Sequence, residues 1–152
     1  MTPVRLTASS IDHISPIAKA MANIHALSFE TGWSAQNMQD HLTHDYVWAM
    51  KDKDTLCAFI IIRLIADQAD IITLATAPTS RRAGYGRTLL AHIHQWLPTQ
   101  GGSILFLDVA EDNAPAIALY EKFNYERFLK RPAYYRRKNG RIAAYTYRKI
   151  FS

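Results

Sequence analysis

Apolar residues recur at intervals of three and four near the start of the chain, which is the spacing of one face of an α-helix. The stretch from Ser10 to Phe29 carries this pattern, and Ser9, Ser10 or Asp12 is available to cap its first turn. The apolar positions are Ile14, Ile17, Met21, Ile24 and Leu27. This spacing predicts an amphipathic helix. A short strand is predicted before it, at Val4 to Thr7.

The next part of the chain changes to runs of branched and aromatic residues, which favour strands. Ser34 first opens a short helical segment. Tyr46 to Met50 and Thr55 to Ala66 then predict an antiparallel hairpin, because the polar turn K-D-K-D separates them. Asp70 to Thr76 continues as a third strand of this meander. Pro78 ends that strand, because proline has no N–H to offer a neighbouring strand.

Helical and strand patterns alternate in the second half of the chain. An apolar stripe at helical spacing ends at Pro98 and consists of Leu89, Leu90, Ile93, Trp96 and Leu97. Ser103 to Val109 follows as an apolar strand with one acid, which suits a central place in a sheet. Asp112, Asn113 and Pro115 are residue types that start helices. They predict a helix that runs to Phe123.

The chain closes with a second pair of strands. Asn124 is a left-handed stop for the preceding helix. Tyr125 to Leu129 and Ala143 to Ile150 are predicted to pair across a basic loop. A meander followed by strands that alternate with helices predicts a mixed α/β fold with one parallel crossover at residues 71–109.

Length and composition limit the classes of protein that this chain resembles. Its 152 residues, 49% of them apolar, predict a single domain over residues 1–152. The one cysteine, Cys57, lies in the apolar run Leu56 to Ile62, so we expect a core residue and no disulfide. That run is far shorter than the roughly 20 residues needed to span a bilayer. We therefore expect a cytoplasmic protein with no membrane partner.

The net charge of +5 is concentrated near the C-terminus. Nine of the 18 Lys and Arg follow Glu126, and no Asp or Glu does. This asymmetry indicates either a solvated basic edge or an anionic partner. Tyr134 and Tyr135 beside Arg136 and Arg137 are compatible with nucleic-acid binding, although no known nucleic-acid motif accompanies them.

The most informative short stretch is T-S-R-R-A-G-Y-G-R-T-L-L, residues 79–90. A glycine loop between a strand and a helix presents unpaired N–H groups at the positive end of the helix dipole, which suits a phosphate. Arg81, Arg82 and Arg87 add positive charge. The stretch is neither G-x-x-x-x-G-K-[ST] nor G-x-G-x-x-G, so the common nucleotide-binding loops are not indicated. The alternative is a tight turn in which Gly84 and Gly86 only relieve steric crowding.

Two motifs in order carry a family resemblance. R-R-A-G-Y-G, preceded by T-A-P and followed by R-T-L-L, resembles the acetyl-CoA signature of the GNAT acetyltransferases. L-D-V-A-E-D-N-A-P-A-I-A-L-Y-E-K-F-N-Y resembles the later motif of the same family. The Tyr134–Tyr135 pair and the G-W-S segment at residues 32–34 are most similar to the RimI type. The resemblance covers residues 27–149 and is loose outside the two motifs.

This resemblance implies a fold, a reaction and a set of site residues. The fold is a mostly antiparallel sheet of six or seven strands with about four helices, and RimI-type enzymes acetylate the N-terminal alanine of a small-subunit ribosomal protein. Acetyl-CoA would be the co-substrate, bound by Leu74, Ala75, Thr76, Arg82, Ala83, Gly84, Tyr85, Gly86, Arg87 and Asn113. Asp108 would be the base, Tyr120 the general acid, and Trp33, Tyr134 and Tyr135 would bind the acceptor.

The chemistry of the reaction agrees with these roles. Attack on a thioester needs a neutral amine, and an α-amine with a pKa of about 7.7 to 8.0 is roughly one tenth neutral at pH 7. Asp108 can therefore act as a modest base, directly or through a water, and Tyr120 can supply a proton to the thiolate. The alternatives are a carboxylate of Asp108 that pairs with an arginine or caps the next helix, and a Tyr120 that is a core aromatic.

The chain departs from the RimI pattern at three places. Asp108 stands where Glu is usual, Asn124 and Tyr125 stand where Gly-Phe is usual, and the acidic residues that often follow the tyrosine pair are absent. The acceptor is thus less firmly indicated than the reaction. A small-molecule or polyamine N-acetyltransferase and a non-catalytic nucleic-acid or ribosome-binding module stay as alternatives. No metal is expected, because His41 and His44 have no evident third ligand.

Overall fold

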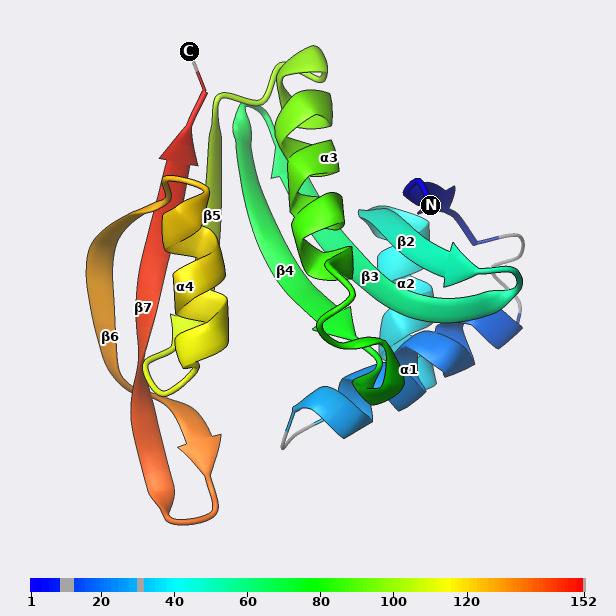
Figure 1. The fold of residues 1–152 in the computed structure, drawn as a ribbon, viewed down its shortest axis with the longest axis horizontal. Coiled ribbons are helices and arrows are strands. Elements are labelled where there is room, and N and C mark those ends of the chain that lie inside the picture. The colour runs from blue at the N-terminus through cyan, green and yellow to red at the C-terminus, as the bar shows by residue number, and fades with distance from the viewer. Residues whose placement is uncertain (9–12, 30–31, 152) are drawn as a thin grey trace.

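The computed structural model describes residues 1–8, 13–29 and 32–151. Seven strands form one sheet in the order β1-β2-β3-β4-β5-β7-β6 (Figure 1). All neighbouring pairs are antiparallel except β4 and β5, which are parallel. The strands are β1 Val4–Leu6, β2 Tyr46–Asp52, β3 Thr55–Ile65, β4 Gln68–Thr76, β5 Ile104–Ala110, β6 Glu126–Arg137 and β7 Gly140–Ile150. The predicted mixed α/β fold with one parallel crossover is confirmed.

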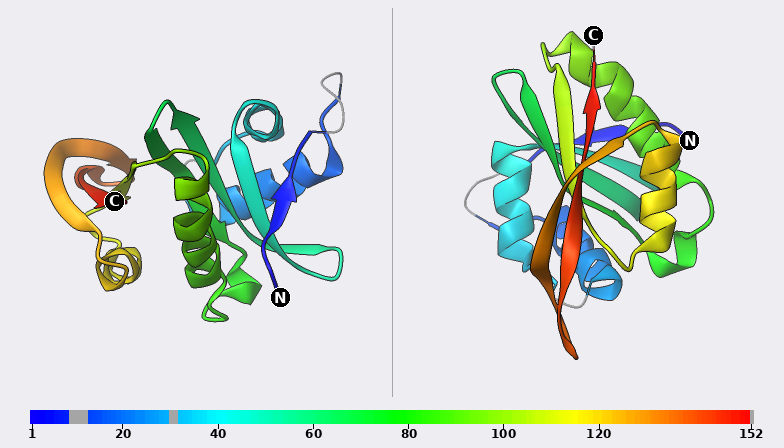
Figure 2. Two further views of the ribbon diagram at one scale, coloured as in Figure 1. Left: turned by 90° about the horizontal axis from the view of Figure 1, so that it is seen from above. Right: turned by 90° about the vertical axis from the view of Figure 1, so that its left-hand side faces the viewer.

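Helices cover both faces of this sheet (Figure 2). Helices α1 and α2 pack on one face, and α3 and α4 pack on the other, so the molecule has two apolar cores separated by the sheet. Cys57 is buried, as predicted. The helices are α1 Pro16–Ser28, α2 Ala35–His44, α3 Tyr85–Thr99 and α4 Ala114–Lys122, and a 3₁₀ turn, η1 Pro78–Ser80, lies between β4 and α3.

The first helix begins later than the apolar spacing predicts. Its N-cap is Ser15, whose side chain accepts a hydrogen bond from the N–H of Ala18, and Pro16 occupies the first turn. Ile14 precedes the helix but packs against the same core. In the sequence it therefore has the spacing expected of one more helical turn. The predicted caps Ser9, Ser10 and Asp12 lie outside the described residues.

The predicted basic loop near the C-terminus is wrong. Strands β6 and β7 continue through it as a long hairpin that turns at residues 138–139 and projects beyond the rest of the sheet (Figure 1). The register of β6 shifts between Arg131 and Tyr135, where Pro132 cannot donate a hydrogen bond and Ala133 has a φ of 52°. An edge strand tolerates such an interruption, because one of its sides has no neighbour.

Helix α3 also differs slightly from the prediction. It ends at Thr99, so Pro98 lies inside its last turn. The chain then turns at residues 100–102, where the N–H groups of Gly101 and Gly102 bond to carbonyl oxygens of the last helical turn. Asn124 has a φ of 65°, which confirms the left-handed stop after α4.

Strands β4 and β5 separate soon after they meet. They pair only from Gln68–Ile104 to Asp70–Phe106. From there β4 continues beside β3 and β5 beside β7, so the two halves of the sheet diverge. The inner edge of β4 up to Thr76 therefore has backbone groups that face an opening in the sheet.

Candidate active site

The glycine loop opens α3 in the conformation that its sequence requires. Arg82 and Gly84 have φ values of 67° and 81°, and Gly84 is the N-cap of the helix. Left-handed conformations of this kind are easy for glycine and rare for other residues. The first N–H groups of a helix have no partner within the helix, so the N–H groups at the start of α3 are available to an anion.

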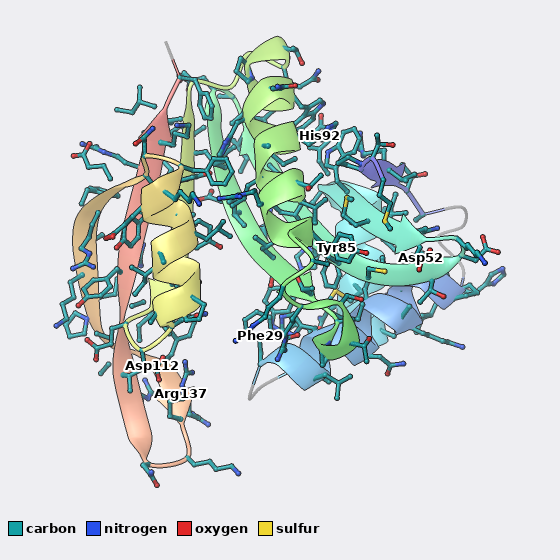
Figure 3. The ribbon with its side chains drawn as sticks, viewed as in Figure 1. Phe29, Asp52, Tyr85, His92, Asp112 and Arg137 are labelled. Carbon is teal, nitrogen blue, oxygen red and sulfur yellow. The ribbon has the colours of Figure 1, made fainter. Side chains whose placement is uncertain are left out.

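The second glycine of the loop leaves room for one more side-chain carbon between α3, β4 and α4, and this gap is called the channel below. A Cβ atom built on Gly86 would lie 3.8 Å from Cδ2 of Leu74 and 3.9 Å from Cδ2 of Leu119. The absent side chain therefore leaves space where β4, α3 and α4 approach one another. Tyr85, in contrast, turns its ring toward the core near β3 (Figure 3) and offers the channel its backbone only.

Asp108 lies on the opposite face of the sheet from this channel. Its neighbours Leu107 and Val109 are buried in the core beneath α3 and α4, so alternation along β5 turns Asp108 toward the α1–α2 side. Thr146 Oγ1 donates a hydrogen bond of 2.5 Å to Asp108 Oδ1. Arg131 Nε lies 3.5 Å from the same oxygen. Asp108 is thus paired with an arginine, which was one of the alternatives open from the sequence.

Tyr120 is buried on the α3–α4 side. Its ring packs edge-on against Tyr125, with centroids 5.5 Å apart. Burial, with a smaller contribution from Tyr135, raises the pKa of Tyr120, so the phenol keeps its proton at neutral pH. Tyr135 contacts β5 as well, because its hydroxyl donates a 3.3 Å hydrogen bond to the backbone oxygen of Asp108.

A groove of about 560 Å³ lies on the α1–α2 side, where β4 and β5 diverge. The predicted acceptor residues Trp33, Tyr134 and Tyr135 all line it, together with Asp108. The remaining lining residues are Gln68, Asp70, Ile71, Ile72, Phe106, Leu107, Phe128, Arg131 and Thr146. Five separate segments of the chain therefore meet at one groove.

One wall of this groove is held by stacked rings. Trp33 stacks on His25 with centroids 4.4 Å apart, and its backbone N–H donates a 3.1 Å hydrogen bond to His25 Nδ1. Burial, reinforced by His41, lowers the pKa of His25 to about 4. His25 is therefore neutral near pH 7 and can accept this hydrogen bond, which fixes the position of Trp33.

The sequence and fold agree with those of known acetyltransferases. Residues 18–125 match the model of the acetyltransferase (GNAT) family. The chain belongs to the GNAT family. Its members transfer an acetyl group from acetyl-CoA, so this GNAT protein is an acetyl-CoA-dependent N-acetyltransferase.

Relatives of this GNAT protein include enzymes of the RimI type, as its motifs predict. It is 32% identical over 110 residues to the [ribosomal protein bS18]-alanine N-acetyltransferase of Escherichia coli K12, covering 72% of this chain and 74% of the relative. The Salmonella typhimurium enzyme of the same name is 39% identical over 82 residues, 54% of this chain and 55% of the relative.

Solved structures give the same result. The crystal structure of the E. coli ribosomal-protein-S18-alanine N-acetyltransferase superposes with a TM-score of 0.86 at 26% identity, covering 99% of this chain and 95% of the other. Arabidopsis thaliana NAA60 in complex with a bisubstrate analogue has a TM-score of 0.81 at 17% identity, over 98% of both chains, and supports the fold alone.

Acetyl-CoA is the co-substrate of GNAT enzymes, and the start of α3 has the chemistry to bind part of it. The N–H groups in the first turn of α3 suit a pyrophosphate, and the absent side chain of Gly86 leaves room beside Leu74 of β4. Asn113 caps α4, accepting a 3.2 Å hydrogen bond from the N–H of Ala116 through Oδ1, which leaves its Nδ2 group for a ligand. Among the described residues, no group of three or more His, Cys, Asp and Glu side chains is placed to hold a metal.

Several groove residues have no signal in the sequence. Asp70 opens a strand, Arg131 lies in what reads as a basic loop, and Thr146 sits in a closing strand. Only the pairing of β5 with β7 and the divergence of β4 from β5 bring these three to Asp108. No helix in the described part of this GNAT chain is long and apolar enough to cross a membrane.

Proposed function

We propose that the enzyme acetylates the α-amine at a protein N-terminus, and that this is the N-terminal alanine of ribosomal protein bS18. The relatives that cover most of this chain carry that protein and that residue in their names. The groove that holds Asp108 is lined by aromatic rings from two sides, Trp33 and the Tyr134–Tyr135 pair, which suits an extended peptide end.

The observation that carries the proposal is that Asp108 lines the groove where β4 and β5 diverge, while Tyr120 is buried in the core on the other face of the sheet. An amine in the groove then attacks the thioester carbonyl from the α1–α2 side. Asp108 accepts the proton that the amine nitrogen loses, directly or through a water. As the C–S bond breaks, Tyr120 donates its proton to the sulfur on the α3–α4 side, and it regains a proton from solvent.

The backbone of β4 supplies the remaining contacts in this proposal. Beyond Asp70 the strand has no neighbour on its inner edge, so backbone groups of Leu74, Ala75 and Thr76 can bind the acetyl and pantetheine arm. N–H groups pre-set toward the carbonyl oxygen would stabilise the charge that develops on it.

The test is acetyl transfer to a panel of amines, followed by mass spectrometry. We expect label on the α-amine of a peptide with the bS18 N-terminus, and none after that amine has been acetylated beforehand. A matched peptide with a free lysine but a blocked α-amine is the control. Label found only on lysine side chains, or only on a polyamine, would refute the acceptor and leave the acetyltransferase intact.

A further inference from the structure

Asp70 occupies the point at which the sheet opens. It is the last residue of β4 that pairs with β5, opposite Phe106, and it lines the same groove as Asp108. Phe106 and Asp108 are two residues apart and share a face of β5. Asp70 and Asp108 therefore approach the opening from its two sides, and both carboxylates are in reach of a group that enters through the groove.

The carboxylates of Asp70 and Asp108 differ in the positive charges and hydrogen-bond donors that surround them. Asp108 accepts a hydrogen bond from Thr146 and pairs with Arg131. Asp70 faces Arg63 across β3 and β4, but that guanidinium is held by two hydrogen bonds of 3.0 and 3.1 Å to Asp45. Within the described part of the chain, no side chain forms a hydrogen bond or ion pair with the Asp70 carboxylate.

The charges that line the groove do not cancel. Two carboxylates, Asp70 and Asp108, share it with one guanidinium, that of Arg131. Partial burial, followed by the charge of Asp108, raises the pKa of Asp70, and Arg63 opposes this shift. Asp70 is exposed to solvent in the groove and forms no hydrogen bond or ion pair with a side chain in the described residues, so a groove with one excess negative charge at this point is complementary to a single cation. An α-amine with a pKa of about 7.7 to 8.0 arrives mainly as such a cation at pH 7.

We propose that Asp70 is the residue that binds the acceptor's ammonium group and places it beside Asp108. This proposal rests on the proposed function, because it requires the acceptor to be an amine. It applies whether a protein N-terminus or a small molecule carries that amine. Asp70 binds the protonated amine, which loses one proton to solvent before the nitrogen attacks. Asp108, held by Thr146 and Arg131, receives the second proton, which the nitrogen loses as the amide forms. Asp70 is thus the residue by which the enzyme selects an acceptor group that carries a positive charge.

The experiment compares Asp70→Asn with Asp54→Asn, which removes the same charge from the exposed β2–β3 turn. Initial rates are measured with an alanine-initiated peptide at saturating acetyl-CoA, and with acetyl-CoA at saturating peptide. We expect Asp70→Asn to raise the peptide KM about tenfold or more while the KM for acetyl-CoA stays within twofold of the wild type. Asp70→Glu should restore much of the peptide affinity, and Asp54→Asn should change neither KM.

A binding measurement separates charge recognition from structural damage. Calorimetry in the presence of CoA should show that the wild type prefers the free peptide to its N-acetylated form, and that Asp70→Asn loses this preference. A peptide KM within twofold of the wild type, or an unchanged preference, would overturn the role of Asp70. If a polyamine proves to be the acceptor, the same comparison is made with it, so the two proposals fail separately.

Discussion

Replacing Gly86 with alanine should make the enzyme more stable and a poorer binder of acetyl-CoA. Gly86 is the second residue of α3, and its φ is not in the left-handed region. Alanine is favoured over glycine inside a helix by up to about 1 kcal/mol. The new methyl would meet Leu74 and Leu119 at ordinary contact distances, 3.8 and 3.9 Å, so no clash offsets this gain.

In the proposed binding mode, the same methyl occupies space that acetyl-CoA needs. It would stand in the channel between β4, α3 and α4, so acetyl-CoA would have to shift or lose its close approach to the backbone. A loss of about 1.4 kcal/mol of binding free energy corresponds to a tenfold higher Kd. A gain of about 1 kcal/mol in stability raises the Tm by roughly 2 to 4 °C for a chain of this size.

Thermal unfolding and calorimetry with CoA measure the two effects on one sample. Gly84→Ala is the contrasting variant, because a Cβ there meets nothing within 4 Å but the φ is 81°. A left-handed conformation costs a non-glycine residue roughly 1 to 2 kcal/mol, so that variant should unfold at a lower temperature. If Gly86→Ala binds CoA as tightly as the wild type, the channel beside Gly86 is not the binding path.

Three further changes test the chemistry and the fold. Tyr120→Phe should keep CoA affinity and lower kcat by roughly 10²-fold, the contribution typical of a lost general acid; a wild-type rate across pH would make it a packing residue. Thr146→Val removes the 2.5 Å hydrogen bond to Asp108 and should cost about 0.5 to 1.5 kcal/mol in urea unfolding, together with a lower kcat/KM; an unchanged kcat/KM would show that this bond does not serve the base. Burial lowers the pKa values of His25 and His94 to about 4, so the unfolded chain binds more protons than the folded one between pH 6.5 and 4. Stability should therefore fall as the pH drops through that window, with a shallower fall in His25→Asn, and an identical slope in that variant would count against a neutral, buried His25.

Local sequence patterns predict most of the helices and strands, because the spacing of apolar residues within an element reflects which of its faces packs against the core. The helix stripe of α3, the apolar strand β5 and the caps at Ser34 and Asn113 all lie where their residue types indicate. These predictions fail where the same residues are compatible with two different local structures. Ile14 continues the helical spacing but precedes the helix, and the basic stretch predicted as a loop between Leu129 and Ala143 lies mostly in β6 and β7.

The site residues also divide into those that a local sequence pattern predicts and those that it does not. The glycine loop, Asp108 and Tyr120 belong to contiguous motifs, so their approximate places follow from the sequence. Asp70 and Arg131 have no motif, and they reach the groove only because β4 leaves β5 after three residue pairs and β6 returns beside β7. The partners of a carboxylate depend on such long-range pairing, which no local pattern contains.

The divergence of β4 and β5 also decides how large an acceptor can be. If the donor enters along α3 and the amine enters from the groove beside α1 and α2, as proposed, the two molecules meet only at the opening and do not compete for room on one surface. The bulk of a folded protein can therefore stay outside while its first residue alone passes Trp33 and Tyr134. We expect size to matter little to this enzyme, and a free, flexible chain end to matter a great deal.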